Sequence, residues 1–457
     1  MTHLQSPVEQ AVGQTSPPAS SVETETVTVQ PPRRRIYPWV VAALAFALLL
    51  SDYMSRQVLS AVFPMLKSEW SLADSELASL TSIVALMVGL LTFPLSVIAD
   101  RWGRVRSLVT MAVIWSIATL FCAIAANYEQ MLIARFFVGV GEAAYGSVGI
   151  AVVLSVFAPR LHSSLSGAFM AGGSFGSVIG VSLGAVIAVN LGWRWSFTAM
   201  AVLGLILAAL FRAIVTEKRL DRYAVHSDTS GIKDGQHVSI RVPVRTLFTN
   251  STVWCIYIAG GLQMFTAGAL LSWTPSFFNR YYGMGTGEAG KVAAIFVLLI
   301  GTGMVVCGVI TDRVSRVNAN NKWTVAIVFC SIALVTLGVA FRLDNGSLQL
   351  VLFGIGAFFS AGISGPTAAM VASLTHESVR SSALGTLTVA NNLLGLALGP
   401  FIVGILADSL GLKGALALAP VFYVGAIVAL LIGRRLYPSG LRKLTEQSAR
   451  YAQQTAA

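Results

Sequence analysis

The sequence has little charge for its length. Aspartate, glutamate, lysine and arginine make up 11% of its 457 residues, whereas hydrophobic residues make up 55%, and the mean hydropathy is +0.74. A soluble protein of this length needs far more charge to cover its surface, so the composition predicts an integral membrane protein. The formal net charge is +11. The basic residues lie between apolar runs rather than in one patch, which argues against nucleic acid as a partner.

Cysteine and histidine are also scarce. The four cysteines fall singly inside apolar runs, so they offer neither a disulfide framework nor a metal-binding spacing. The five histidines lie in tails or loops, and the sequence contains no nucleophile elbow and no phosphate-binding loop. We therefore expect no enzyme activity, no catalytic residue, no metal site and no cofactor.

The amino-terminal segment differs from the rest of the chain. Its first 30 residues are polar and contain no lysine or arginine. They lack the charged start and the short apolar core of a cleaved signal peptide. We expect residues 1–35, which end in three consecutive arginines, to form a disordered tail.

Twelve apolar runs are long enough to cross a bilayer as helices, which requires about 20 residues each. They are 38–63, 74–99, 105–126, 130–157, 162–189, 195–215, 251–279, 289–311, 323–342, 347–373, 381–406 and 413–434. The sequence therefore predicts an all-α integral membrane protein with twelve transmembrane helices. Its expected parts are a six-helix bundle at 36–215, a central loop at 216–250, a second six-helix bundle at 251–436 and a tail at 437–457.

Basic residues in the connections predict the orientation. If the amino terminus is cytoplasmic, six of the 31 lysines and arginines fall outside, namely Lys67, Arg194, Arg280, Lys291, Arg342 and Lys413. Two more, Arg56 and Arg135, lie within spans. We therefore expect both termini and the central loop to be cytoplasmic. Because six is an even number, the two halves have the same orientation and form parallel repeats.

A short charged motif occurs at corresponding places in the two halves. It follows the second span as Asp100, Arg101 and Arg104, and it follows the eighth span, 212 residues later, as Asp312, Arg313 and Arg316. A single copy would be explained as a short basic loop on the cytoplasmic side. Two copies, each with an acid before the arginines, predict a cytoplasmic gate in which arginines reach carboxylates or helix carbonyl ends.

Twelve spans in two parallel halves, a basic central loop and this motif resemble the major facilitator superfamily of secondary transporters. The family loop pattern is Gly-x-x-x-Asp-Arg-x-Gly-Arg-Arg/Lys, from which Ser96 and Ser315 depart. In the fourth span, Arg135 and Gly139 resemble the family's Arg-x-x-x-Gly motif. The resemblance covers about residues 36–436. It implies transport by alternating access, usually by a monomer.

Two stretches are most similar to the Spinster-like branch of the family, residues 55–82 and 139–147. Members of this branch with known substrates include lysolipid and sphingolipid exporters. The organic-anion symporters are also similar in the first span. Both groups usually carry Asp-Arg there, whereas this sequence has Ser55-Arg56, so the usual proton acceptor is missing from its expected place.

Four charged residues of the first half stand out because they fall well inside the predicted spans, at bilayer depth. Asp52 and Arg56 share one face of the first helix, and Arg135 and Glu142 share one face of the fourth. A charge at bilayer depth costs at least about 2.5–3.5 kcal/mol, so we expect these residues to be functional. We expect Glu142 to carry a proton with Asp52 and Arg135 as coupling partners, and Arg56 to bind an anionic substrate. The alternative is a neutral network that only positions helices.

The second half has no charge at the corresponding positions, so we expect it to read the shape of the substrate. The polar and aromatic candidates for substrate binding are Gln263, Trp273, Ser360, Asn391 and Asn392. Each of these residues taken alone is more often a helix-packing residue than a ligand.

Glycines recur every four residues along the fifth span, at Gly172, Gly176, Gly180 and Gly184. Such a stripe of small residues predicts that another helix packs very close to this face. The superfamily's antiporters usually carry Gly-Pro in the fifth span, and this span has no proline. The difference favours symport.

The leading hypothesis is a proton-coupled symporter that moves a small organic anion by alternating access across the cell (inner) membrane. Its partners would be the small-molecule substrate, protons and the lipid bilayer, and it would work as a monomer. The alternative is a Spinster-like exporter of a lysolipid or another amphipathic solute. A channel stays open as a hypothesis, although it would not need two halves with so unequal a charge distribution.

Overall fold

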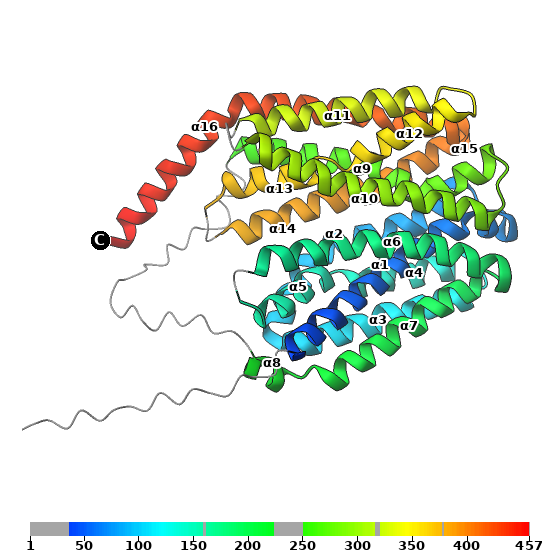
Figure 1. Ribbon diagram of the computed structural model, residues 1–457, viewed down its shortest axis with the longest axis horizontal. Coiled ribbons are helices and arrows are strands. Elements are labelled where there is room, and N and C mark those ends of the chain that lie inside the picture. Colours follow the sequence, from blue (N-terminus) through cyan, green and yellow to red (C-terminus); the bar gives the residue numbers. More distant parts are fainter. Residues whose placement is uncertain (1–35, 159–160, 224–249, 316–319, 377–378, 457) are drawn as a thin grey trace, which may run out of the picture.

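A computed structural model describes residues 36–158, 161–223, 250–315, 320–376 and 379–456. Residues 1–35, including the predicted amino-terminal tail, and residues 224–249 of the predicted central loop lie outside the described residues. The described residues are helical apart from short connections (Figure 1).

The first half consists of eight helices. They are α1 (Ile36–Trp70), α2 (Asp74–Trp102), α3 (Arg104–Ile124), α4 (Tyr128–Glu142), α5 (Tyr145–Ser155), α6 (His162–Leu191), α7 (Trp193–Ile214) and the short α8 (Glu217–Tyr223). The fourth predicted span is thus built from two helices, α4 and α5, with a break at Ala143 and Ala144.

The second half repeats this pattern. Its elements are α9 (Ser251–Tyr281), α10 (Thr286–Ser315), α11 (Asn321–Ala340), α12 (Ser347–Ser360), α13 (Ser364–Ser373), α14 (Arg380–Ala390), the π-helical η4 (Asn391–Ala397), α15 (Leu398–Leu418), the 3₁₀ turn η5 (Ala419–Val421) and α16 (Phe422–Ala456). The tenth predicted span is again two helices, α12 and α13.

Eleven stretches of the described residues are long and apolar enough to cross a membrane. The last of them, Ser382–Glu446, has 65 residues. At about 1.5 Å per residue it would be far longer than the roughly 30 Å hydrocarbon core. Gly411 interrupts it with φ 72° and ψ 158°, a conformation that favours glycine, and the chain returns from there as α16. Counted as two crossings, this stretch completes the twelve predicted spans, which confirms the all-α membrane fold.

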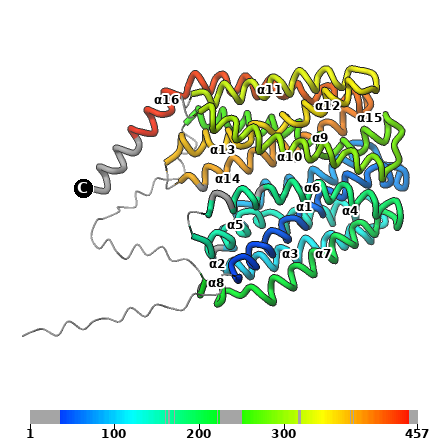
Figure 2. The backbone as a smooth tube through the Cα atoms, viewed as in Figure 1, coloured from blue at the N-terminus to red at the C-terminus, as the bar shows by residue number. Residues whose placement is uncertain are grey.

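The two halves lie side by side, and their long helices run between two ends of the molecule (Figures 1 and 2). One end holds the start of α1, α8 and the carboxy-terminal part of α16, and we call it the termini end. The other end holds the connections from α1 to α2 and from α9 to α10, and we call it the far end.

The glycine stripe of α6 packs against α1, as the sequence predicts. A Cβ added at Gly176 would lie 2.6 Å from the carbonyl oxygen of Leu50, and one at Gly180 would lie 2.7 Å from that of Met54. Backbone can approach this closely only where no side chain intervenes. The stripe therefore fixes α1, which carries Asp52 and Arg56, at a short distance from α6.

Near the far end the two halves are in close contact. A Cβ added at Gly404 of α15 would lie 2.8 Å from the carbonyl oxygen of Asp74 in α2, and Gly290 of α10 packs tightly on Ala185 of α6. Further toward the termini end, an apolar groove of about 180 Å³ opens on the seam between α6 and α10. It is lined by Ala171, Ser174, Phe175, Leu298, Gly301, Thr302, Val305 and Val306.

Two predicted boundaries differ from the structure. Residues 216–250 were expected to be a loop, but they begin with α8, whose Glu217 accepts a hydrogen bond from the backbone N–H of Val105 at 2.8 Å and so caps α3. Residues 437–457 were expected to be a tail, but α16 continues through Pro438 to Ala456. This segment is rich in good helix formers such as Lys, Arg, Gln and Ala, which extend a helix once it has started.

Candidate functional site

The centre of the first half contains an ion pair between its first and fourth spans. Arg56 of α1 donates from Nε and Nη2 to Oε2 of Glu142 in α4, at 3.0 Å and 2.7 Å. The Glu142 side chain is fully buried, whereas 17% of the Arg56 side chain is exposed. Arg56 is therefore the member of the pair that an incoming solute can reach.

The break in the fourth span positions Glu142. Glu142 is the last residue of α4, and the carbonyl oxygen of Ala143, which follows it, accepts a hydrogen bond from Thr92 Oγ1 of α2 at 2.7 Å. A carbonyl released from a helix ladder needs another partner, and Thr92 supplies one. The break was not predicted, because the span is apolar on both sides of it.

Asp52 lies beside this pair. It is buried, and it is close enough to Glu142 and Arg56 to interact electrostatically with both. Oδ1 of Asp52 and Oε1 of Glu142 are buried and accept from no donor among the described residues, and the two carboxyl groups are close enough to share a proton. A buried oxygen of this kind is costly when charged, so each of the two carboxyl groups offers a place where a proton would lower the free energy.

The sequence predicts that Arg135 acts on Glu142, and the two side chains are close enough to interact electrostatically, while the hydrogen bonds of Arg135 go to other partners. It is fully buried and donates to the backbone carbonyl oxygens of Leu80, Ser55 and Arg56, at 3.2 Å, 3.3 Å and 3.4 Å. Its guanidinium therefore ties α4 to α1 and α2 through the backbone. The positive charge of Arg135 thus lies close to the cluster, although its hydrogen bonds go to backbone carbonyls and not to a carboxylate.

Two neighbours of Arg56 were not among the predicted site residues. The guanidinium carbon of Arg56 lies 5.3 Å from the centroid of the Tyr53 ring, which is the distance of a cation–π contact. Ser55, which replaces the acid usual in related families, donates its hydroxyl to the carbonyl oxygen of Asp52 at 2.8 Å. The substituted residue thus turns back on its own helix, and Asp52 is the acid that α1 contributes.

The second half has a neutral contact at the corresponding place. Gln263 of α9 donates from Nε2 to the carbonyl oxygen of Ser360, the last residue of α12, at 2.7 Å. The Tyr423 hydroxyl donates to the same oxygen at 3.0 Å. Ser360 donates its own hydroxyl to Ala357, so its side chain is already occupied. Gln263 is buried and its Oε1 has no partner among the described residues.

Asn391 and Asn392 open the π-helical segment η4 in the eleventh span. Asn392 donates from Nδ2 to the carbonyl oxygen of Thr388 at 2.9 Å, and Asn391 Oδ1 lies over Gly260 of α9. The Oδ1 atoms of both residues are buried without a partner among the described residues. π-Helical turns inside α-helices are rare and frequently lie at functional sites, and the predicted pair falls on one.

Trp273 has a packing environment. It is fully buried, its Nε1 donates to the carbonyl oxygen of Pro400 at 3.2 Å, and its ring centroid lies 5.3 Å from that of Phe63 in α1. Its Nε1 is thus hydrogen-bonded within the protein, and its ring packs against Phe63. The structure places Trp273 at the contact between the halves and away from the unpartnered polar atoms of Gln263, Asn391 and Asn392.

The predicted gate residues lie at the termini end. Arg101, Arg104, Asp312 and Arg313 are exposed there, while the side chain of Asp100 and all of Arg316 lie outside the described residues. Gly103, which follows the first motif's Asp-Arg, has φ 107° and lets the chain turn sharply from α2 into α3.

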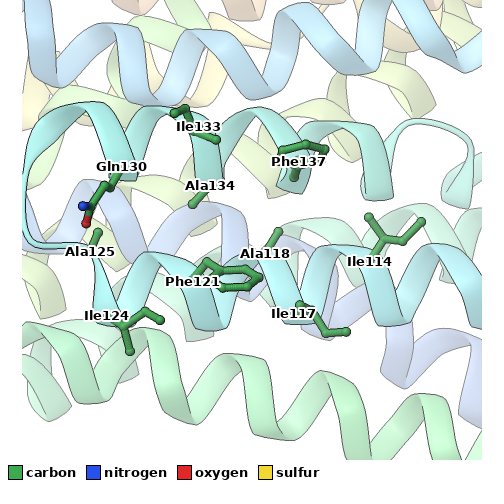
Figure 3. Close-up of a pocket in the computed structure, with 10 residues that line it drawn as sticks. All are labelled: Ile114, Ile117, Ala118, Phe121, Ile124, Ala125, Gln130, Ile133, Ala134 and Phe137. Carbon is green, nitrogen blue, oxygen red and sulfur yellow. The ribbon is translucent and has the colours of Figure 1, made fainter.

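A larger groove lies apart from these residues, between α3 and α4 (Figure 3). It has a volume of about 550 Å³ and is lined by Ile114, Ile117, Ala118, Phe121, Ile124, Ala125, Gln130, Ile133, Ala134 and Phe137. Most of its large side chains are exposed on the outside of the bundle. A lipid-facing surface of a membrane protein is expected to be apolar in this way, so we assign no solute to the groove.

Comparison with known proteins agrees with this fold. Residues 45–393 match the profile of the family described as Major Facilitator Superfamily. The chain is similar to the "Probable L-galactonate transporter" of Escherichia coli strain K12, with 24% identity over 387 residues, which cover 82% of this chain and 84% of the relative. It is also similar to the hexuronate transporter of the same strain, with 23% identity over 404 residues, 85% of this chain and 92% of the relative.

Among solved structures, the chain resembles a bacterial homologue of the human lysosomal transporter Spinster, crystallised in an inward-facing and unoccupied conformation. The TM-score is 0.78 at 18% sequence identity, with 89% of this chain and 98% of the other covered. At this identity the likeness shows the fold alone. Because the family profile matches most of the chain, the protein belongs to the major facilitator superfamily, and it is a multi-pass secondary transporter rather than an enzyme.

Proposed function

We propose that the protein is a proton-coupled symporter of a small organic anion, and that its substrate is a hydroxylated carboxylate such as a sugar acid. The observation that carries the proposal is the ion pair between the partly exposed Arg56 and the buried Glu142. A substrate carboxylate can replace Glu142 on the guanidinium, because arginine binds carboxylates in a forked geometry.

Coupling follows from the burial of Glu142. When a substrate carboxylate takes its place on Arg56, the freed Glu142 carboxylate is left buried without a counter-charge, which is costly. A proton removes that cost. The occupied transporter therefore carries one proton for each substrate carboxylate held on Arg56, with Asp52 as the neighbouring proton acceptor and Arg135 as a fixed positive charge.

The choice of a sugar acid rests on the second half and on the relatives. The buried and unpartnered oxygens of Gln263, Asn391 and Asn392 are hydrogen-bond acceptors, which suit the hydroxyl groups of a polyol. The relatives reported above are named as transporters of hexuronates and L-galactonate. In this proposal Ser360 orients Gln263 through its backbone carbonyl, and Trp273 packs at the contact between the halves without binding the substrate.

The orientation and the gate belong to the same proposal. The termini end is cytoplasmic, in the cell (inner) membrane, and the transporter works as a monomer. Asp100, Arg101 and Arg104 of the first motif, with Asp312, Arg313 and Arg316 of the second, close the termini end when the far end opens. Contact between the halves near the far end supports assigning the described state to an inward-facing conformation.

The test uses purified protein in liposomes that enclose a pH-sensitive dye. We expect external galactonate or glucuronate to evoke inward proton flux through the wild type, and Glu142→Gln to abolish this flux. Glu69→Gln is the matched control, because Glu69 is an acid of α1, in the same half as Glu142, that pairs with Arg194 at the far end. Proton flux that persists in Glu142→Gln contradicts the assignment of the proton to Glu142.

The second candidate is a Spinster-like exporter of a lysolipid or another amphipathic solute. The apolar groove on the seam between α6 and α10 favours it, because a lipid substrate needs a lateral way into the transporter. The same liposomes distinguish the two candidates. A response to lysolipid with no response to any sugar acid or short carboxylate would replace the symporter with the exporter and leave Arg56 a structural role.

A further inference from the structure

Four charged residues meet at the far end, and each half contributes one acid and one base. Lys67 of α1 and Asp74 of α2 come from the first half, and Arg280 of α9 and Asp408 of α15 come from the second. Only 4% of the Asp74 side chain is exposed. The cluster lies far along α1 from Arg56 and Glu142, and it plays no part in the coupling described above.

The first link between the halves is an arginine–carboxylate pair. Arg280 donates from Nη1 to Oδ2 and from Nη2 to Oδ1 of Asp74, both at 2.7 Å. Lys67 forms an ion pair with Asp74 from the same half. A forked pair of this kind is strong and directional, and the buried carboxylate at its centre has both oxygens engaged.

The second link runs the other way. The carboxylate of Asp408, from the second half, accepts hydrogen bonds from the backbone N–H groups of Asp74 at 2.7 Å and Ser75 at 3.1 Å. These N–H groups belong to the first turn of α2 and have no partner within their own helix. A carboxylate at a helix amino terminus is favourable, and here the other half of the protein supplies it.

Both links must break if the halves are to part at the far end. Lys67 and Asp74 stay together in that case, whereas Arg280 loses its carboxylate and the first turn of α2 loses its cap. We propose that Lys67, Asp74, Arg280 and Asp408 form an electrostatic latch that holds the far end shut, and that its strength sets the ratio of the two alternating-access states.

The experiment measures that ratio directly. Spin labels are placed at Glu129 and Asp344, two exposed far-end positions in different halves, after the native cysteines are replaced by alanine. Electron–electron distances are recorded for wild type, Arg280→Gln and Asp408→Asn in lipid nanodiscs without substrate. We expect each variant to gain a longer-distance population. Arg280→Gln, which leaves the buried Asp74 carboxylate without its arginine, should raise the ratio of far-end-open to far-end-closed molecules at least about tenfold. Asp408→Asn should raise it less, because this side chain is exposed and an asparagine oxygen can still accept from the first turn of α2.

Arg194→Gln is the matched control. Arg194 is also a far-end arginine, but its ion pair with Glu69 joins α7 to α1 inside one half, and both side chains are substantially exposed. We expect its distance distribution to match the wild type. The proposal is overturned if the Asp408→Asn and Arg280→Gln proteins, monodisperse in size-exclusion chromatography, keep the wild-type distribution. Because the measurement uses neither substrate nor protons, this result is independent of the symport assay.

Discussion

The two halves of the protein make the same contact with different chemistry. In the first half, α1 meets the end of α4 through the charged pair of Arg56 and Glu142. In the second half, α9 meets the end of α12 through an amide that donates to a backbone carbonyl, from Gln263 to Ser360. In both halves the contact lies where the helix is broken.

This difference separates two roles. A carboxylate and a guanidinium can exchange partners with a solute or a proton, because each stays satisfied after the exchange. A backbone carbonyl cannot take up a proton near neutral pH and keeps its place. In the proposed function, the ion pair of the first half therefore responds to pH, and the unpartnered oxygens of the second half accept hydrogen bonds from the substrate.

The largest effect should come from removing the Arg56 guanidinium, which supplies the positive charge of the contact in the first half. We expect Arg56→Gln to weaken the binding of glucuronate by about 100-fold or more, because the desolvated carboxylate of the substrate loses the guanidinium that we assign to it. Isothermal titration calorimetry of the detergent-solubilised protein measures this change. An affinity within threefold of the wild type would contradict the role of Arg56 as the anion ligand, and Arg194→Gln should keep the wild-type affinity.

Removing the Gln263 side-chain amide tests the corresponding contact of the second half. Gln263→Leu removes one hydrogen bond from the carbonyl of Ser360 and leaves it the Tyr423 bond, so we expect a loss of about 0.5–1.5 kcal/mol in stability. Thermal unfolding of the purified protein measures this loss. The pH dependence of the remaining transport should keep its wild-type midpoint, since no titrating group has changed. A shifted midpoint would mean that the second half also takes part in proton coupling.

The smallest expected effect concerns substrate shape. Asn391→Ala removes a buried acceptor that we assign to a substrate hydroxyl, which is worth about 1 kcal/mol, or roughly fivefold in affinity. The same variant should bind a short acid without hydroxyl groups as tightly as the wild type. Competition binding with both ligands gives the comparison, and equal losses for both would remove Asn391 from hydroxyl recognition.

Sequence spacing placed Asp52 with Arg56, and Arg135 with Glu142, on single helix faces, because four and seven residues along a helix return to the same face. The prediction of one cluster also needed the matching depths of the two pairs and the helix arrangement that the family resemblance implies. It did not fix the partners. The pairing of Arg56 with Glu142, and of Arg135 with backbone carbonyls, depends on the rotation of whole helices and on the break after Glu142.

The far-end cluster shows another limit of the sequence. From the sequence, Lys67 and Arg280 were predicted only to be basic residues of external connections. Their common partner, Asp74, is 206 positions from Arg280 in the chain, and no local pattern joins the two residues. The glycine stripe on α6 could be predicted from the sequence, because residues four apart lie on one face of a helix. Only the identity of the partner helix, α1, had to come from the structure.

The π-helical turn of η4 makes the eleventh span differ from the fifth span, its counterpart in the first half. A π turn closes its hydrogen bond one residue later than an α turn, so it holds one residue more than the span needs. The fifth span of the first half, α6, contains no such turn. The two halves thus differ at this turn, and beyond it Gly399 packs closely against the backbone of Phe265 in α9. Deleting one residue from η4 should therefore leave a regular α-helix whose later residues keep their direction, whereas the same deletion in α6 would turn all later residues of that helix by about 100° about its axis.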